Sequence, residues 1–342
     1  MIRMSKGKIA LVTGGAGFIG SHMADRLIRD GWHVRIIDNF STGKLENIAH
    51  HKSNSHVEII QGDLKNLEDC LKAIKGVEAV FHFAANPEIR ISTMRPVVHF
   101  NENIVATFNL LESIREKCDS TCLVFASSSS VYGEPKTIPI GEDALMSPVS
   151  VYGASKAACE NLIHAYSTLY GIRSVALRYA NVVGPRLRHG VLFDLIMKLK
   201  GNSNELEILG DGKQIRSYIY IDDAIEASMT AFNSIGEHFE LYNVGSESWI
   251  MVTEIADAVC EVMNLKPRYI FKPMLHGVGW LGDVKRIALK VDRIKSLGWR
   301  PRFDSMRAIE MTAVSLSKEL NATNSISQLR TRRKGRNYSK WR

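Results

Sequence analysis

The stretch VTGGAGFIGSH, residues 12–22, decides the fold of this chain. It places Gly14, Gly17 and Gly20 in a G-x-x-G-x-x-G spacing between an apolar run at 9–14 and a helical pattern at 18–30. The first glycine permits a tight turn, the second lets backbone N–H groups approach a pyrophosphate, and the third lets helix and strand pack closely. The N-terminus of the helix attracts the phosphate charge. The stretch therefore predicts a strand–turn–helix unit that binds a dinucleotide.

An acidic residue supports this interpretation and narrows the choice of cofactor. Asp38 ends the next apolar run, at 33–38, and lies 18 residues after Gly20. A carboxylate there can accept hydrogen bonds from both ribose hydroxyls and repels a 2′-phosphate, so the sequence favours NAD over NADP. Asp63 closes a further run, and we expect Asp63 and Leu64 to border the adenine. A helix N-cap after the strand is an equally good interpretation of Asp63.

Apolar runs alternate with helix-length segments through the first half of the chain. Strand-like runs lie at 9–14, 33–38, 57–63, 79–85, 122–128 and 174–181, and helix-like segments at 18–30, 66–75, 101–117 and 152–170. This alternation predicts an α/β fold with a doubly wound parallel sheet, the Rossmann fold. After residue 181 the alternation of strand-like runs and helix-like segments becomes irregular, which predicts a smaller, mixed α/β C-terminal domain. We expect residues 1–181 and 215–248 to form the NAD-binding domain, and 182–214 and 249–320 the substrate-binding domain.

The composition is typical of a soluble globular protein. Of the 342 residues, 45% are hydrophobic and 23% are charged. No apolar run approaches the roughly 18 residues of a membrane span. We find no secretory signal, and the five cysteines form no CxxC pair, so we expect reduced thiols and a cytoplasmic location without membrane association. The eleven histidines show no metal-ligand spacing, and we expect no metal site.

The basic charge is concentrated at the C-terminus. From Ser325 onward the chain has seven Lys or Arg residues and no acid, and these account for all but one of the net charge of +8. We expect a disordered, solvated tail over 321–342, because the segment has little to bury. Contact with nucleic acid or an anionic membrane surface is the weaker interpretation.

Two copies of Val-Tyr-Gly compete for the role of a catalytic tyrosine. Tyr132 and Tyr152 each have a lysine four residues later, Lys136 and Lys156. Pro135 disfavours a helix after Tyr132, whereas the segment after Tyr152 has helical periodicity, so only the second pair shares a helix face. An ammonium beside a phenol favours the phenolate and lowers the phenol pKa, as a general acid/base requires. We therefore predict that Tyr152 is the acid/base.

These motifs together resemble the extended short-chain dehydrogenase/reductase family, which includes the NAD-dependent epimerases and dehydratases. The resemblance is carried by TGGAGFIG, Asp38, FHFAA, SSSSVYG, the Tyr152/Lys156 pair, LRYANVVGPR and YIYIDDAIEA, in order and at family spacing. DNFSTGK at 38–44 and the segment 181–200 are most similar to the UDP-glucose 4-epimerases. The resemblance also implies a homodimer through 101–117 and 152–170, although the periodicity of these helices fits burial within one chain equally well.

The resemblance assigns roles to individual residues. It implies that Ser128 completes a catalytic set with Tyr152 and Lys156, that Asn181 binds substrate, and that Arg216 binds its pyrophosphate. Beyond the glycines, the expected cofactor contacts are Asp38, Asp63, Leu64, Phe18, Ile19, Asn39, Ser41, Thr42, Gly43, Phe83, Ala84, Ala85, Asn103, Tyr152, Lys156 and Tyr179. The expected substrate contacts are Ser128, Tyr152, Asn181, Val191, Arg216 and Asp283.

Two departures from the family pattern bear on the reaction. Ser129 and Ser130 stand where 4,6-dehydratases carry an Asp-Glu pair, and hydroxyls have no useful acidity, so dehydration is disfavoured. Trp280 stands where relatives often have a phosphate-binding arginine. We expect Lys285 or Arg286 to substitute for it, or the diphosphate to be held differently.

The leading hypothesis is reversible inversion at C4 of a UDP-sugar, through transient oxidation and hydride return. UDP-glucose and UDP-galactose are the expected pair, and Ile287 beside the sugar leaves room for an N-acetyl group. A UDP-glucuronate epimerase or decarboxylase, or a nucleotide-sugar reductase, is the alternative within the family. A non-catalytic nucleotide-binding protein with a basic interaction tail is the alternative of another class.

Overall fold

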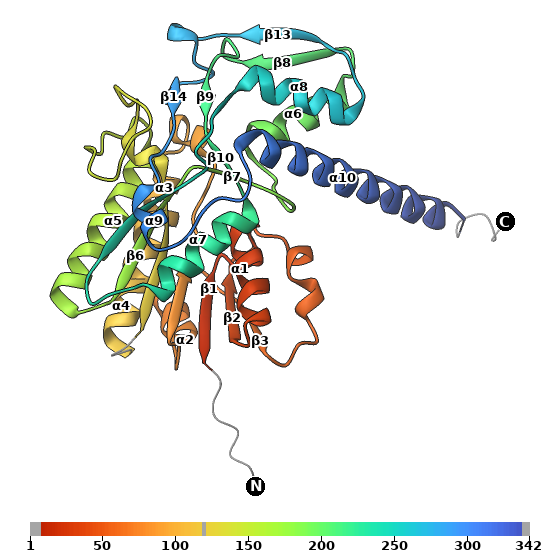
Figure 1. Cartoon of the computed structure of the whole chain (residues 1–342). Helices are drawn as coiled ribbons and strands as arrows, with labels where there is room; N and C mark the ends of the chain where they lie inside the picture. The colour runs from red at the N-terminus through yellow and green to blue at the C-terminus, as the bar shows by residue number, and fades with distance from the viewer. Residues whose placement is uncertain (1–7, 118–120, 337–342) are drawn as a thin grey trace.

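A seven-stranded parallel sheet forms the centre of the computed structural model, which describes residues 8–117 and 121–336, with side chains through 321 (Figure 1). The strand order is β11-β6-β5-β4-β1-β2-β3, and every neighbouring pair is parallel. This topology confirms the predicted doubly wound α/β fold. The strands are β1 Ile9–Thr13, β2 His33–Asp38, β3 Val57–Gln61, β4 Ala79–His82, β5 Cys122–Ser128, β6 Ser174–Tyr179 and β11 Glu240–Val244.

Apolar side chains fill both faces of this sheet. Along β1, Ala10 and Val12 belong to one buried cluster and Leu11 to another, because successive side chains of a strand point to opposite faces. Each face is covered by helices, which explains why the strands read as nearly continuous apolar runs. The first cluster includes α1 Phe18–Arg29 and α7 Ile221–Asn233, and the second includes α2 Leu67–Ala73, α4 Ala106–Lys117 and α5 Val151–Tyr170.

Short helical segments fill several connections between these elements. The helix predicted at 101–117 begins as a π-helical turn that passes into α4. The segments are η1 Leu45–Asn47, η2 Ala49–His51, η3 Ile89–Thr93, α3 Val97–His99, η4 Phe100–Val105, η5 Ser129–Tyr132 and η6 Leu275–Gly277.

The smaller part of the chain lies over the carboxyl ends of the sheet strands (Figure 1). It contains a parallel pair of strands, β8 with β13, and a three-stranded sheet in the order β12-β9-β14, while β7 pairs with β10. Its elements are β7 Asn181–Val183, α6 Gly190–Gly201, β8 Glu205–Leu209, β9 Ile215–Arg216, β10 Tyr218–Tyr220, β12 Ile250–Met251, α8 Val252–Met263, β13 Arg268–Lys272, β14 Arg286–Ile287, α9 Asp292–Ser296 and α10 Ser305–Arg336.

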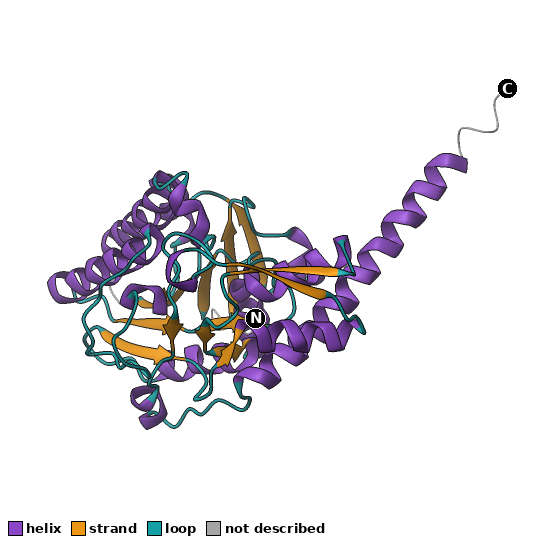
Figure 2. Cartoon of the chain, turned by 90° about the horizontal axis from the view of Figure 1, so that it is seen from above, coloured by secondary structure: helices purple, strands orange, loops and turns teal. Residues whose placement is uncertain are grey.

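The last helix, α10, runs away from the body of the molecule in both views (Figure 1, Figure 2). The expectation of disorder over 321–342 therefore differs from the structure through Arg336, and 337–342 lie outside the described residues. Extending a helix that is already anchored by packing requires no new nucleation, which accounts for the difference. Within the described part of the chain, no helix is long and apolar enough to cross a membrane.

Candidate active site

A cavity of about 680 Å³ opens where the carboxyl ends of the strands meet the smaller part of the chain. Ligand pockets are commonly of this size and occur at this edge of an open α/β sheet. Every residue predicted to contact cofactor or substrate lines the cavity, with the exception of Asn103. The long-range arrangement expected from the motifs is therefore present.

The glycine turn forms the floor of one end of the cavity. Gly14 adopts a left-handed φ of 64°, and a Cβ at this position would lie 2.8 Å from the backbone of Ala84. A Cβ at Gly20 would lie 2.2 Å from the carbonyl oxygen of Gly14. Gly17 is the N-cap of α1 and offers no side-chain cap, so the helix N-terminus presents free N–H groups at the cavity. These residues fit a bound pyrophosphate.

The carboxylate of Asp38 is built into the adjoining wall. It is 7% exposed and accepts hydrogen bonds from the backbone N–H groups of Ala16, at 2.9 Å, and Phe40, at 2.8 Å. Burial raises the pKa of Asp38, against the lowering effect of these two bonds. A Cβ at Gly43 would lie 2.7 Å from the same carboxylate, so glycine is needed there. The carboxylate retains lone pairs for the hydroxyls of a ribose.

The structure distinguishes the two interpretations of Asp63. The N-cap of α2 is Asn66, whose side chain accepts from the N–H of Glu68, so the capping interpretation of Asp63 is wrong. Asp63 lines the cavity and accepts from the side chain of Asn39 at 3.2 Å. Its position fits the border of an adenosine site.

Asn103 lies behind the cavity wall rather than in it. The side chain is 1% exposed, and its Nδ2 donates to Ser155 Oγ at 2.7 Å. Its Oδ1 accepts from the backbone N–H of Asn86 at 3.0 Å. The structure therefore corrects the expected cofactor contact: Asn103 supports the segment at Asn86, which does line the cavity.

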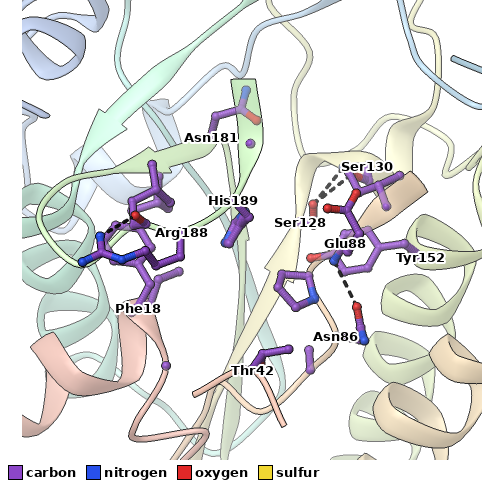
Figure 3. A pocket seen from close by; sticks show the side chains of 18 of the residues that line it. Phe18, Thr42, Asn86, Glu88, Ser128, Ser130, Tyr152, Asn181, Arg188 and His189 are labelled. Atoms are coloured by element: carbon purple, nitrogen blue, oxygen red, sulfur yellow. Dashed lines mark hydrogen bonds between the residues drawn. The ribbon is translucent and has the colours of Figure 1, made fainter. Parts of the chain in front are cut away.

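Tyr152, Lys156 and Ser128 meet at the centre of the cavity, as the sequence predicted. Tyr152 and Lys156 come from the first turns of α5, and Ser128 ends β5. Figure 3 shows Ser128, Ser130 and Tyr152 on the same wall. The hydroxyl of Ser128 lies near the phenol of Tyr152 and acts to lower its pKa, while Ser128 Oγ donates to Ser130 Oγ at 3.0 Å. The arrangement places a phenol and a hydroxyl where both can reach one substrate oxygen.

The pKa of this phenol differs from the expectation. Burial raises the pKa of Tyr152 to about 12, although the nearby hydroxyl of Ser128 opposes the shift. Burial also lowers the pKa of Lys156 to about 8. The ammonium donates to the carbonyl oxygen of Ala126 at 2.8 Å and lies 6.0 Å from the centre of the Tyr152 ring. The predicted lowering by Lys156 is therefore wrong for this structure, because desolvation dominates.

The other Val-Tyr-Gly tyrosine has a structural role. Tyr132 is 2% exposed and does not line the cavity. Its hydroxyl donates to Asn243 Oδ1 at 2.7 Å and accepts from Nη1 of Arg178 at 2.9 Å. Arg178 in turn forms a buried ion pair with Glu160, with an Nη2–Oε2 distance of 2.7 Å. The sequence argument that excluded Tyr132 agrees with this geometry.

The predicted substrate residues other than Ser128 and Tyr152 line the cavity from the smaller part of the chain. The amide of Asn181 donates to the carbonyl oxygen of Ser217 at 3.2 Å. Arg216 forms an ion pair with Asp283 at 2.7 Å, and its side chain is 13% exposed. Val191 and Trp280 also line the cavity.

Neither cation proposed to replace the missing arginine reaches the cavity. Lys285 Nζ pairs with Asp211 at 2.5 Å, and neither Lys285 nor Arg286 belongs to the lining. Arg216 does line the cavity; it lies in β9 and is paired with Ile287 of the neighbouring strand β14. The proposal that Lys285 or Arg286 substitutes for an arginine at Trp280 therefore finds no support in the lining.

The sequence analysis did not single out Glu88 and Arg90, two charged residues that line the cavity. Glu88 and Arg90 follow β4, and Arg90 pairs with Glu88 at 3.0 Å and with Asp194 of α6 at 3.2 Å. Glu88 and His189 face the cavity from opposite sides in Figure 3. Their signal was available, because ANPEIR directly follows a parallel strand, where ligand-contacting residues gather.

Comparisons with known proteins agree with this geometry. Residues 10–245 match the model of the NAD dependent epimerase/dehydratase family. A UDP-glucose 4-epimerase of Corynebacterium glutamicum is 31% identical over 327 residues, covering 91% of this chain and 96% of that protein. A crystal structure of a UDP-galactose 4-epimerase is 46% identical, with a TM-score of 0.82 and coverage of 91% of this chain and 99% of that one.

A third comparison extends the range of sugars among the relatives. The UDP-glucuronic acid 4-epimerase of Bacillus cereus, in complex with UDP-glucuronic acid and NAD, is 30% identical with a TM-score of 0.83. The alignment covers 91% of this chain and 99% of that one. On the family match, the identities and the shared fold, this chain belongs to the NAD-dependent epimerase/dehydratase family, whose cofactor is NAD.

Proposed function

We propose that the protein is an NAD-dependent 4-epimerase that interconverts UDP-glucose and UDP-galactose. The observation that carries the proposal is that Ser128, Tyr152 and Lys156 line the same cavity as the glycine turn. A protein that only binds nucleotides needs no acid/base pair at the centre of its cavity. The names of the relatives support an epimerase of UDP-sugars.

The roles of the side chains follow from where they lie. Tyr152 must first release its own proton to solvent; as the phenolate it then accepts the proton of the sugar 4-hydroxyl while the C4–H bond gives up its hydride, and Ser128 orients that oxygen and relays the proton. Bound NAD supplies reversible hydride exchange with C4. After the 4-keto sugar turns over, Tyr152 returns the proton to the oxygen, so the atoms and charges balance over one cycle. Lys156 lines the cavity where it could bind the nicotinamide ribose.

The sugar nucleotide would be held at the end formed by Asn181 and Arg216. A diphosphate must share or displace the contact between Arg216 and Asp283, since that guanidinium already donates to the carboxylate at 2.7 Å. Bidentate guanidinium–phosphate bonds are strong enough to make such an exchange favourable. Ser129 and Ser130, which lack useful acidity, continue to disfavour dehydration at C5 and C6.

The charges of the cavity favour a neutral sugar over a uronic acid. Each arginine that lines the cavity is already paired with a carboxylate of the described chain: Arg90 with Glu88 and Asp194, Arg186 with Asp25, Arg188 with Glu319, and Arg216 with Asp283. A substrate carboxylate would have to compete for one of these arginines or pair with Lys44 or Lys156, which also line the cavity, and it would enter a site that contains Glu88. UDP-glucuronate remains the second candidate, because the Bacillus cereus relative acts on it.

We also propose that the protein is a cytoplasmic homodimer. The four described cysteines are free thiols, as expected in a reducing compartment. Large apolar side chains are exposed along the helices predicted to pair, including Phe108 of α4 and Val151, Leu169 and Tyr170 of α5. Size-exclusion chromatography with light scattering tests this proposal, and a monomeric mass at micromolar concentration would contradict it.

Proton NMR of the purified chain with each of three substrates tests the function. UDP-glucose, UDP-N-acetylglucosamine and UDP-glucuronate are supplied separately with NAD and without a reductant. A new anomeric signal of the C4 epimer, without accumulation of NADH, would support epimerisation and identify the sugar. Accumulated NADH would favour a reductase-type reaction. Bound substrate with no conversion of any of the three would overturn the proposal in favour of a binding role.

A further inference from the structure

A cluster outside the catalytic cavity brings together two histidines and an aspartate. Asp25 lies on α1, and His50 and His51 follow one another in η2. The Oδ1 atom of Asp25 lies 2.8 Å from Nε2 of His50 and 2.6 Å from Nε2 of His51. Within the described residues, this is the group of three whose ligand atoms could hold a metal ion.

We propose that Asp25, His50 and His51 form a binding site for a divalent transition-metal ion of the Zn²⁺ class. Imidazole nitrogen and carboxylate oxygen are ligands that suit Zn²⁺, and three protein ligands with one open position form a common type of zinc site. Both imidazoles use the same nitrogen, Nε2, and aim it at the same carboxylate oxygen.

The burial of the three side chains suits a site that is formed in the protein and open to solvent. His51 is 11% exposed and Asp25 is 19% exposed, so both have fixed positions, while His50 is 47% exposed and gives an ion access. Zinc bonds of about 2.0–2.1 Å in tetrahedral geometry separate neighbouring ligand atoms by roughly 3.3 Å. Relative to the distances in the structure, the Asp25–His50 pair must open by about 0.5 Å and the Asp25–His51 pair by about 0.7 Å, so both imidazoles must turn away from the carboxylate when an ion binds. Both imidazoles would coordinate in the neutral form, with the proton on Nδ1.

The second oxygen of Asp25 connects the cluster to the catalytic cavity. Oδ2 accepts from Nη2 of Arg186 at 2.8 Å, and Arg186 lines the cavity from the loop after β7. Arg186 has a left-handed φ of 68°, so the ion pair with Asp25 helps to hold Arg186 in a strained backbone conformation. An ion on Oδ1 leaves Oδ2 available for Arg186. Metal binding would therefore brace three segments beside the cofactor: α1, the loop after β2 and the loop after β7.

The guanidinium also sets a limit on affinity. Arg186 already neutralises the carboxylate, and a second cation nearby costs electrostatic energy. We therefore infer a site that is filled reversibly at elevated metal concentration, in contrast to a closed structural zinc site. This inference does not depend on the identity of the sugar substrate.

Calorimetric titration of the full chain with ZnCl₂, after removal of metals by a chelator and in the presence of NAD, tests the proposal. We expect one Zn²⁺ per chain, and His50→Ala and His51→Ala should each weaken binding at least about tenfold, since even the outer partners of a metal ligand contribute that much. His56→Ala is the matched control: His56 stacks on His33 at 4.4 Å and forms no such group with an acid in the described chain.

Visible absorption of the Co²⁺ complex provides an independent measurement. Intense d–d bands in the wild-type chain, lost in His51→Ala and retained in His56→Ala, would support coordination by the cluster. Circular dichroism establishes that each variant is folded, and His51→Gln replaces His51→Ala if that variant does not fold. The proposal is overturned if the wild-type chain binds no Zn²⁺, or if His50→Ala and His51→Ala bind it as tightly as His56→Ala.

Discussion

The two Val-Tyr-Gly tyrosines should respond in opposite ways to removal of the hydroxyl. Tyr132→Phe deletes a bond to the charged Arg178 and a bond to Asn243, at 2.9 and 2.7 Å. A bond to a charged group contributes about 1.5–3 kcal/mol and a neutral bond about 0.5–1.5 kcal/mol, so the free energy of unfolding should fall by about 2–4 kcal/mol. Arg178 keeps its bonds to Glu160, which places the loss within this range and not above it.

Tyr152→Phe should instead abolish turnover in a stable protein. The hydroxyl that it deletes lies near Ser128, on a half-buried side chain that lines the cavity. General acid/base catalysis contributes about 10²–10⁴-fold to a rate, and kcat should fall by at least this factor. The hydroxyl is only half-buried and faces the cavity, so we expect little loss of stability.

Two assays on the same pair of proteins separate the effects. Urea unfolding followed by fluorescence gives the change in free energy at a fixed m-value, and NMR of the UDP-sugar gives kcat at a temperature where both variants are folded. Tyr132→Phe should retain kcat within about threefold, since it lies outside the cavity. The reasoning is refuted if folded Tyr132→Phe loses turnover while Tyr152→Phe keeps it.

Three further perturbations test other parts of the structure. Glu160→Gln leaves the buried Arg178 without its counter-charge, and urea unfolding should show a loss of about 3–5 kcal/mol; a loss below about 1 kcal/mol would contradict the ion-pair interpretation. Gly20→Ala places a Cβ 2.2 Å from the Gly14 carbonyl oxygen, so fluorescence titration should show weaker NAD binding and melting a lower Tm. Buried His82 has its pKa lowered from 6.5 to about 3, so between these values the unfolded chain binds a proton that the native chain excludes, and stability should fall as the pH falls; in His82→Gln the pH dependence of urea midpoints should be flatter over this window.

The sheet could be predicted because its evidence is local in the sequence. The run at 9–14 reads as a strand that ends at Gly14, and the structure forms β1 over Ile9–Thr13 with the turn at that glycine. Asp38 could be placed for the same reason: it is the last residue of β2, and that end of the strand lies at the cavity independently of the conformation of the loops. In a parallel sheet the carboxyl ends of all strands lie at the same edge. Recognising a strand in the sequence therefore also places the residue at its carboxyl end beside the ligand site.

Pairings between distant segments had no comparable signal. Arg216 was expected to be available to phosphate, but the structure pairs it with Asp283, 67 residues later. The spacing of the histidines predicted no metal site, and only the packing of η2 beside α1 reveals that His50 and His51 share a partner, Asp25. Such contacts depend on how loops cross the surface of the sheet, and spacing within either loop carries no information on the crossing.

For Tyr152 and Lys156, the sequence predicted where the side chains lie but not how their environment shifts their pKa values. Helical spacing located both side chains correctly, because i and i+4 positions share a face in any helix. The predicted sign of the Tyr152 pKa shift was wrong, because the shift depends on what surrounds the two side chains. Burial acts on both groups, and one N–H of the Lys156 ammonium donates to the carbonyl oxygen of Ala126. Desolvation favours the neutral form of each group, so the phenol must lose its proton before it can accept one from the substrate, and the positive charge of a nicotinamide bound beside it would favour that loss. A dry, preorganised site of this kind strengthens each charge interaction that the transition state forms, and the raised pKa of the resting phenol is the expected cost of that environment.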